Sequence, residues 1–198
     1  ITYMTKQDKP ALILIDIQKG FEDEDIEYWG GRRNNPDAET NAGRLLDFWR
    51  QNNLPVFHVQ HCSTNPESKF AEGKTGNDFQ DIIKPIAGEQ IIKKNVHSAF
   101  IGTDFKQQLD KSNIKKLIIA GLTTDHCIST TARMAGDYGY DTYVVSDATA
   151  TFDKEGADRQ KYPAEIIHQT ALASLHKEFV TVIKTKELIT QMRFKAKG

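Results

Sequence analysis

The chain has 198 residues, 38% of them hydrophobic, which is enough for one globular domain with a sizeable core. Its formal net charge of -1 excludes the basic surplus typical of proteins that bind nucleic acid or anionic membranes. No apolar run is long enough to cross a bilayer, and the sequence does not start like a signal peptide. The two cysteines, Cys62 and Cys127, are too few for a disulfide framework, and we expect a reduced, cytoplasmic protein.

Short apolar runs rich in branched residues recur along the chain and predict buried strands. They lie at residues 11–15, 56–59, 117–120, 142–145 and 179–183, and the pair Ile91 and Ile92 indicates one more. None of these runs alternates between apolar and polar residues, as a half-exposed sheet would require. We therefore expect a sheet that is covered on both faces.

Helical patterns fill the gaps between these runs. The first begins at Asn35-Pro36, which suit an N-cap and a first helical position, and has an apolar face within residues 38–49. Further helices are expected after Thr103, after Cys127, and within residues 163–175. Strands that alternate with helices predict βαβ units, a parallel sheet and a single domain over residues 1–198.

Two long segments, residues 19–34 and 61–89, show no regular pattern. Loops of this length in a compact domain are usually functional or disordered. The first contains Phe21, Tyr28, Trp29 and the pair Arg32-Arg33, so we expect it to be a lid over a pocket. Two roles are open for the arginines, which could bind a substrate carboxylate or make a subunit contact.

Three ionisable residues stand where predicted strands end. Asp16 follows the run at 11–15 directly, Lys94 follows Ile91 and Ile92 after one residue, and Cys127 opens a helix shortly after the run at 117–120. Because the carboxyl ends of parallel strands meet at one edge of a sheet, we expect these side chains to lie close together. The ammonium group and the helix start would lower the pKa of the thiol, and the carboxylate would accept its proton. The sequence thus predicts a nucleophilic cysteine.

Four motifs together give the chain a recognisable pattern. They are DIQKGF from Asp16, KNVHSAF from Lys94, AGLTTDHCISTTARMA around Cys127, and GYDTYVVSDATATF. In this order they resemble the isochorismatase-like cysteine hydrolases, which include nicotinamidases, N-carbamoylsarcosine amidohydrolases and ureidoacrylate hydrolases. The resemblance covers residues 11–188. It implies an α/β, three-layer Rossmann-like fold with a central, mostly parallel six-stranded sheet and helices on both faces.

The resemblance also implies a set of catalytic groups. Asp16, Lys94 and Cys127 correspond to the Asp–Lys–Cys triad of the family, and Lys94 is preferred to its lysine neighbour by its offset from the Ser-Ala-Phe that follows. A non-proline cis peptide is implied at Leu122–Thr123, with the backbone N–H groups of Thr123 and Cys127 as the oxyanion hole. The implied reaction is hydrolysis of an amide, ureido or carbamoyl C–N bond through a thioester on Cys127.

Several side chains near these motifs are candidates for contact with substrate: Phe21, Trp29, His61, Phe100 and Thr124. His126 precedes the nucleophile, and we expect it to project away from the pocket on its helix. Nicotinamidases of the family carry an Asp-x-His…His metal site after the second strand. The stretch HVQHCSTNPESKF has His58 and His61 but lacks the acidic ligand and the second properly spaced histidine. We therefore predict no metal and no other cofactor.

Two alternatives to amide hydrolysis stay open. Isochorismate hydrolases of the same superfamily cleave a vinyl ether, and several of them lack the cysteine, so Cys127 favours C–N hydrolysis without excluding the ether reaction. A member without catalytic activity could instead serve as a binding or assembly module. The expected partner is a small-molecule substrate, with no nucleic acid and no membrane. The resemblance further implies a homo-oligomer, either a dimer or a tetramer.

Overall fold

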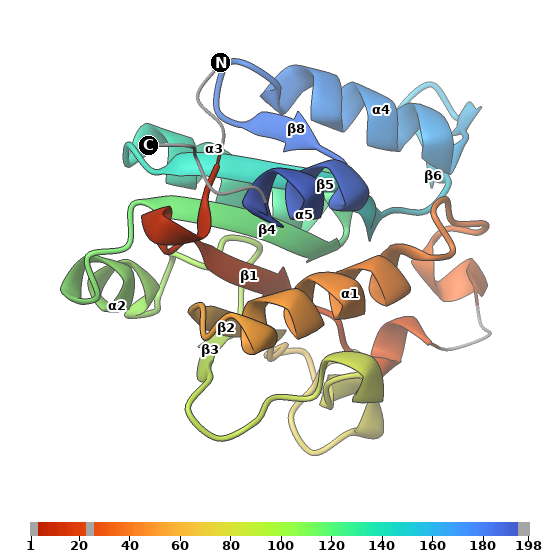
Figure 1. Cartoon of the computed structure of the whole chain (residues 1–198). Coiled ribbons are helices and arrows are strands. Elements are labelled where there is room, and N and C mark those ends of the chain that lie inside the picture. The colour runs from red at the N-terminus through yellow and green to blue at the C-terminus, as the bar shows by residue number, and fades with distance from the viewer. Residues whose placement is uncertain (1–3, 23–25, 194–198) are drawn as a thin grey trace.

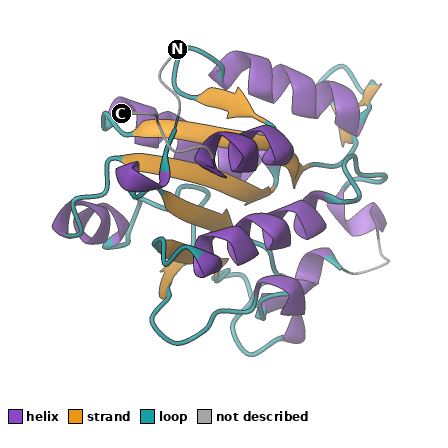
Figure 2. Ribbon diagram, in the orientation of Figure 1, coloured by secondary structure: helices purple, strands orange, loops and turns teal. Residues whose placement is uncertain are grey.

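A parallel sheet of six strands forms the centre of the structure. The computed structural model describes residues 4–22 and 26–193. In spatial order the strands are β3 (Gln90–Lys94), β2 (Val56–His61), β1 (Ala11–Ile15), β4 (Lys116–Leu122), β5 (Asp141–Ala150) and β8 (Thr181–Ile183). All neighbouring strands pair in parallel, and their arrows run the same way in Figure 2. A separate antiparallel ribbon consists of β6 (Lys154–Glu155) and β7 (Lys161–Tyr162).

Helices cover both faces of the sheet, so the predicted α/β class is confirmed. On one face lie α1 (Ala38–Gln51) and α5 (Thr185–Arg193), on the near side in Figure 1; on the other lie α2 (Phe105–Lys111), α3 (Ser129–Asp137) and α4 (Ala164–Leu175). Every residue of β1 is buried: Leu12 and Leu14 pack with α1, whereas Ile13 and Ile15 pack with the opposite helices. A strand buried on both faces has no reason to alternate in polarity.

No helix in the described residues is long and apolar enough to cross a membrane. The start of α1 differs from the prediction, because the helix begins at Ala38 with Asp37 as its N-cap. Asn35 instead adopts a left-handed conformation, with φ at 43°, and its side-chain amide donates hydrogen bonds to the carbonyls of Ser146 and Thr149. Asn35 therefore ties the approach of α1 to β5 rather than capping the helix.

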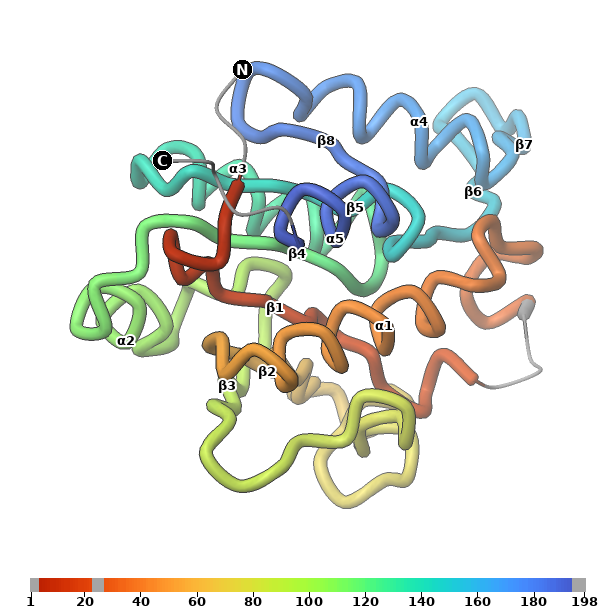
Figure 3. Tube along the Cα trace, in the orientation of Figure 1, coloured from red at the N-terminus to blue at the C-terminus, as the bar shows by residue number. Residues whose placement is uncertain are grey.

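The two long segments fold back over the carboxyl ends of the strands. They contain short 3₁₀ turns, η2 (Lys19–Phe21), η3 (Ile26–Trp29), η4 (Thr75–Asn77) and η5 (Asp81–Ile83), while η1 (Lys6–Asp8) precedes β1. Figure 3 shows the chain between β2 and β3, in yellow to yellow-green, as a long excursion. Asn77 holds it in place by donating to the carbonyl oxygens of His61 and Phe70, each at 2.9 Å. Residues 23–25 of the predicted lid lie outside the described residues.

A glycine lets β1 and β4 approach closely at the ends that carry the site. Gly121 has φ at 128°, and a Cβ added there would lie 2.0 Å from the carbonyl oxygen of Ile15. The next residue of the neighbouring strand, Asp16, also has a positive φ, 54°. The two strand ends therefore place Asp16 beside the turn that leads from β4 to Cys127.

Candidate active site

The three predicted catalytic residues meet at the carboxyl edge of the sheet. Asp16 follows β1, Lys94 ends β3, and Cys127 lies in η6 (Thr124–Ile128), a π-helical turn between β4 and α3. The Lys94 Nζ donates a hydrogen bond to Asp16 Oδ2 at 2.8 Å and another to Cys127 Sγ at 3.3 Å. The lysine and aspartate side chains are only 0% and 3% exposed, respectively. The sequence therefore predicted correctly that the three residues converge, and their catalytic role stays a prediction.

His61, at the end of β2, is a third partner of the same ammonium group. Its Nδ1 lies 2.9 Å from Lys94 Nζ. Ligand-type atoms of Asp16, His61 and Cys127 lie within 4.8 Å of one another, which is a spacing that could hold a metal ion. In this structure the Lys94 ammonium is within hydrogen-bond distance of all three and already supplies the positive charge. His58 takes no part in this cluster, because it lies 2.6 Å from Glu89 Oε2 on the other face of β2.

Burial decides the ionisation of the thiol. Desolvation raises the pKa of Cys127 well above the ordinary value, the charge of Asp16 raises it further, and Lys94 lowers it by less. Lys94 acts in the expected direction, but the net shift is opposite to the expected one, because the ammonium does not outweigh the loss of solvent around a thiol that is 7% exposed. Burial lowers the pKa of Lys94, but Asp16 and Cys127 raise it above its ordinary value. The resting site thus holds a neutral thiol beside a lysine–aspartate ion pair.

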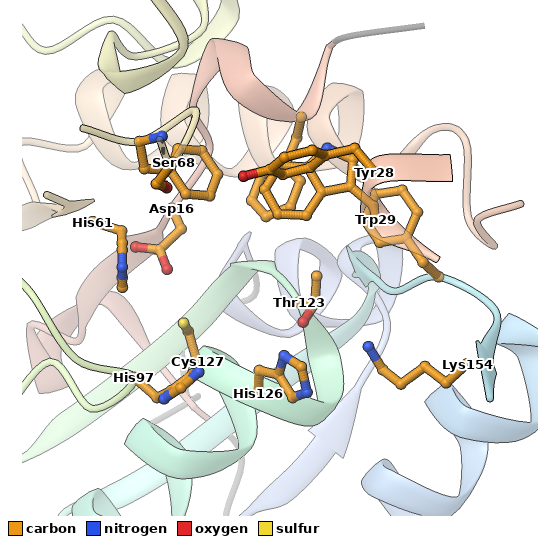
Figure 4. A pocket seen from close by; sticks show the side chains of 13 residues that line it. Asp16, Tyr28, Trp29, His61, Ser68, His97, Thr123, His126, Cys127 and Lys154 are labelled. Carbon is orange, nitrogen blue, oxygen red and sulfur yellow. Dashed lines mark hydrogen bonds between the residues drawn. The ribbon is translucent and has the colours of Figure 1, made fainter. Parts of the chain in front are cut away.

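A cavity of about 290 Å³ opens above these groups. Aromatic side chains form one wall, and Figure 4 shows Tyr28 and Trp29 on the side opposite Cys127. The other aromatic residues that line the cavity are Phe21, Phe70 and Phe152. The ring centroid of Trp29 lies 4.5 Å from that of Phe21 and 5.3 Å from that of Phe70. Asp16, His61, Thr123 and Cys127 supply the polar groups, and His97, His126 and Lys154 lie on the side away from the rings.

Three of the five candidate substrate-binding residues line this cavity, namely Phe21, Trp29 and His61. The other two, Phe100 and Thr124, do not. The Phe100 ring packs in the core with its centroid 4.9 Å from that of Phe105. Thr124 is fully buried behind the turn, where its Oγ1 lies 2.7 Å from His168 Nδ1.

His126 differs from the expectation, and the arginine pair lies outside the cavity lining, so its subunit contact stays a prediction. His126 lines the cavity, with its ring centroid 5.6 Å from that of His97. The prediction that it projects away assumed an ordinary α-helical start, whereas the Ile128 N–H bonds to the Thr123 carbonyl in a wider π-helical turn. Among the described residues Arg32 and Arg33 do not line the cavity. Their side chains form ion pairs with Glu165 and Glu39 at 2.6 and 2.8 Å, and the backbone of Arg33 pairs with that of Phe152 in the cavity wall.

Several residues that line the cavity were not predicted from the sequence: Ser68, Phe70, His97, Phe152 and Lys154. Phe152 ends the motif GYDTYVVSDATATF, so that motif could have indicated it. Ser68 and Phe70 lie in a segment without periodicity, and no local pattern marks them. His97 lies in the motif KNVHSAF, three residues after Lys94.

The turn that carries the predicted oxyanion donors lines the same cavity. The peptide bond between Leu122 and Thr123 is cis, as the resemblance implied. Thr123 and Cys127 both line the cavity, and their role as oxyanion donors stays a prediction. The Thr123 Oγ1 is buried and has no hydrogen-bond partner among the described residues.

Sequence matches to known proteins cover nearly the whole chain. The sequence model of the isochorismatase domain matches residues 10–187. The uncharacterized isochorismatase family protein YrdC of Bacillus subtilis is 44% identical over 183 residues, covering 92% of this chain and 96% of its own length. The maleamate amidohydrolase of Pseudomonas putida is 25% identical, over 93% of this chain and 87% of its own.

Solved structures agree with this assignment. A crystal structure of an isochorismatase-family protein from Chromobacterium violaceum is 33% identical, with a TM-score of 0.90 over 96% of this chain and 97% of its own. The sequence match and the similarity of the fold lead to the same assignment. The chain belongs to the isochorismatase family of hydrolases.

Proposed function

We propose that this protein hydrolyses a C–N bond of a small amide, ureido or carbamoyl compound, with Cys127 as the nucleophile. The observation that carries the proposal is the Lys94 ammonium, which donates to both Asp16 Oδ2 and Cys127 Sγ beneath the cavity. A thiol, a carboxylate and a cation held this closely are the groups that covalent catalysis needs. The same site serves a substrate of limited size, because the cavity above it measures about 290 Å³.

The first half of the reaction forms a thioester. Asp16 takes the thiol proton on Oδ1, the carboxylate oxygen that has no partner among the described residues. The sulfur attacks the substrate carbonyl carbon, and the backbone N–H groups of Thr123 and Cys127 bind the oxygen as it becomes negative. When the tetrahedral intermediate collapses, the C–N bond breaks and Asp16 returns its proton to the departing amine or ammonia.

The second half regenerates the enzyme. Asp16 removes a proton from water, which attacks the thioester carbonyl. The C–S bond breaks, the acid product leaves, and the proton on Asp16 returns to the sulfur. Lys94 keeps its charge throughout, because its ammonium stabilises the carboxylate before the proton transfer and the sulfur during it. The high pKa of the buried thiol fits this order of events, since the proton leaves only when attack begins.

The walls of the cavity favour a particular kind of acyl group. Rings of Phe21, Trp29, Phe70 and Phe152 face the thiol and provide an apolar surface with few polar atoms. A flat or small apolar acyl group would lie against these rings. The polar end of the substrate would then face His97, His126 and Lys154.

An ammonia-release screen over primary amides, carbamoyl compounds and ureido acids tests the proposal, with Cys127→Ala as the blank. We expect release by the wild-type protein and none by the variant. If a vinyl ether such as isochorismate is cleaved and activity survives in Cys127→Ala but not in Asp16→Asn, the reaction is ether hydrolysis and the proposal is wrong. Binding of the same compounds without turnover would indicate a catalytically inactive member.

A further inference from the structure

The partners of Lys94 determine which nitrogen of His61 carries a proton. A lysine ammonium has three donor hydrogens and accepts none. Within the described residues it has three acceptors at 2.8, 2.9 and 3.3 Å, which are Asp16 Oδ2, His61 Nδ1 and Cys127 Sγ. His61 Nδ1 can accept a hydrogen bond only when it bears no proton. A neutral ring must then carry its proton on Nε2.

The surroundings of His61 keep it in this neutral form. Burial lowers the pKa of His61, and the positive charge of Lys94 lowers it further, whereas Asp16 acts in the opposite direction. His97 is the other titratable group that acts on it, and its charged form would also lower this pKa. A protonated ring would place a second positive charge 2.9 Å from the lysine ammonium.

Hydrogen bonds between two buried side chains and the His61 backbone fix the position of its ring. The backbone N–H of His61 donates to Gln18 Oε1 at 2.9 Å, and its carbonyl accepts from Gln18 Nε2 at 3.0 Å and Asn77 Nδ2 at 2.9 Å. The Gln18 and Asn77 side chains are both buried. The ring also contacts Phe70, with centroids 5.8 Å apart. Figure 4 shows it beside the Asp16 carboxylate at the edge of the cavity.

We propose that His61 is a substrate-binding residue whose Nε2–H donates a hydrogen bond to an oxygen of the substrate close to the scissile carbonyl. His61 lines the cavity, and its Nε2 has no hydrogen-bond partner among the described residues. The substrate is thus an amide-type compound with a second acceptor, such as a carbonyl, hydroxyl or carboxylate oxygen, near the bond that breaks. A simple alkyl amide would leave this donor without a partner, which disfavours its binding.

The inference deepens the proposed function, but its first test needs no substrate. Two-bond proton–nitrogen correlation spectra of the protein labelled with ¹⁵N-histidine distinguish the two neutral tautomers and the charged ring. The His61 signals are identified by their loss in His61→Gln. We expect the Nε2–H tautomer at neutral pH, still neutral below about pH 6.5, where an ordinary histidine takes up its proton. In Lys94→Met this preference should disappear, with the signals of His58 and His168 as a folding control.

Alkylation of Cys127 provides the second test. Iodoacetamide has a carbonyl oxygen next to the carbon that reacts, whereas allyl iodide has a similar size and no acceptor. In both cases the sulfur bonds to carbon, iodide leaves and Asp16 takes the thiol proton. If His61 binds such an oxygen, the ratio of the two rates should fall about fivefold to tenfold in His61→Phe. His61→Gln, which keeps an N–H donor on a side chain of similar reach, should recover most of the ratio. Cys62, outside the cavity, serves as the reference thiol.

These results separate the inference from the proposed function. A His61 ring with its proton on Nδ1, or a charged ring at neutral pH, overturns the inference. So does an alkylation ratio that is equal in the wild-type protein, His61→Phe and His61→Gln. If no amide is hydrolysed, the proposed function is contradicted instead. The tautomer of His61 and the alkylation ratio do not depend on that result and still test the inference.

Discussion

Two carboxylates with little exposure, Asp16 and Glu89, contact residues on opposite faces of β2: one belongs to the reactive cluster and the other to a structural one. Each carboxylate is connected to a histidine of this strand. Glu89 contacts His58 directly, and Asp16 is linked to His61 through the Lys94 ammonium. His58 and His61 are three positions apart, so the alternation of a strand sends them to opposite faces. Similar residue types thus occur in two different surroundings within one strand.

Glu89 has partners on both of its oxygens. Its Oε1 accepts from Arg50 Nε at 2.7 Å, and its Oε2 accepts from Arg50 Nη2 at 2.9 Å and lies 2.6 Å from His58 Nε2. Asp16 has Lys94 on Oδ2 only, and its Oδ1 is unpartnered within the described residues. Glu89 does not line the cavity, whereas Asp16 does. A buried carboxylate with a partner on each oxygen stabilises the fold, whereas a buried carboxylate oxygen without a partner can still accept a proton.

The largest effect should come from the thiol on the reactive side. Cys127→Ala should lower turnover by at least about 10⁴-fold, because no other group can form the covalent intermediate. The melting temperature should stay close to that of the wild-type protein, since the change removes one sulfur from the wall of a cavity. Ammonia release and a thermal melt of the same sample measure both quantities. Wild-type turnover in this variant would contradict the assignment of the nucleophile.

The structural cluster should respond in the opposite way. Glu89→Gln should lower the free energy of unfolding by about 3 kcal/mol, because it leaves Arg50 and His58 without their buried anion. Turnover per folded molecule should not change. Urea unfolding measures the loss, and Glu72→Gln is the matched control, because the Glu72–Lys93 pair is exposed and should have no measurable effect. Loss of activity in Glu89→Gln at a temperature where it is folded would show that the two clusters are coupled.

The pH dependence of stability separates the ionisable partners of the structural cluster. Burial lowers the pKa of His58, although Glu89 raises it, so the unfolded chain takes up a proton near pH 6.5 that the folded chain does not. Stability therefore falls as the pH drops below about 6.5, by at most about 1.4 kcal/mol per pH unit for this group. Between about pH 7 and 5, the free energy of unfolding of His58→Gln, measured with urea, should fall less steeply with decreasing pH than that of the wild-type protein. An equal slope would contradict the buried, neutral state of His58.

Glu89 should act at lower pH. Burial raises its pKa, but hydrogen bonds from Arg50 and His58 outweigh this and hold it at about 2. Its contribution to stability is complete above the unfolded value of about 4.3 and is lost as the pH falls toward 2. The difference in stability between the wild-type protein and Glu89→Gln should accordingly shrink in this range. A difference that is constant with pH would mean that the charge of Glu89 contributes nothing.

The smallest effect concerns two neighbouring threonines. Thr123→Val removes a buried hydroxyl that has no partner among the described residues, and should stabilise the protein by about 1 kcal/mol. Thr124→Val is the matched control and should destabilise it by about 1–2 kcal/mol, because it leaves His168 Nδ1 without the hydroxyl 2.7 Å away. Chemical denaturation of both variants measures the difference. Destabilisation by Thr123→Val would show that its hydroxyl has a structural role.

Much of the fold could be predicted because its signals are local. The apolar runs at 11–15 and 117–120 are buried on both faces, and they appear as β1 and β4 with the predicted positions. It was harder to predict which of Lys93 and Lys94 belongs to the site, because either lysine could be a surface charge. Successive residues of a strand face opposite sides, and here Lys93 is 60% exposed while Lys94 is 0% exposed. The offset within KNVHSAF identified the buried one.

The pocket was less predictable, because its aromatic wall comes from three separate parts of the chain. Phe21, Trp29, Phe70 and Phe152 meet in one cluster, and nothing local in the sequence joins Phe70 to the others. The direction of the His126 side chain could not be predicted either, because it depends on a π-helical turn and not on ordinary α-helical spacing. Phe100 belongs to the KNVHSAF motif that marks the site, yet it packs in the core.

By itself, the sequence determined the α/β fold, the family, and the three strand ends at which Asp16, Lys94 and Cys127 stand. These follow from apolar periodicity and from motifs that occupy neighbouring positions in the chain. Only the tertiary structure decided how the groups are paired and charged. Ionisation depends on burial and on distances between residues remote in sequence, so Cys127 is a neutral thiol and His61 shares the ammonium of Lys94. Those contacts exist only once β1, β2, β3 and β4 lie side by side.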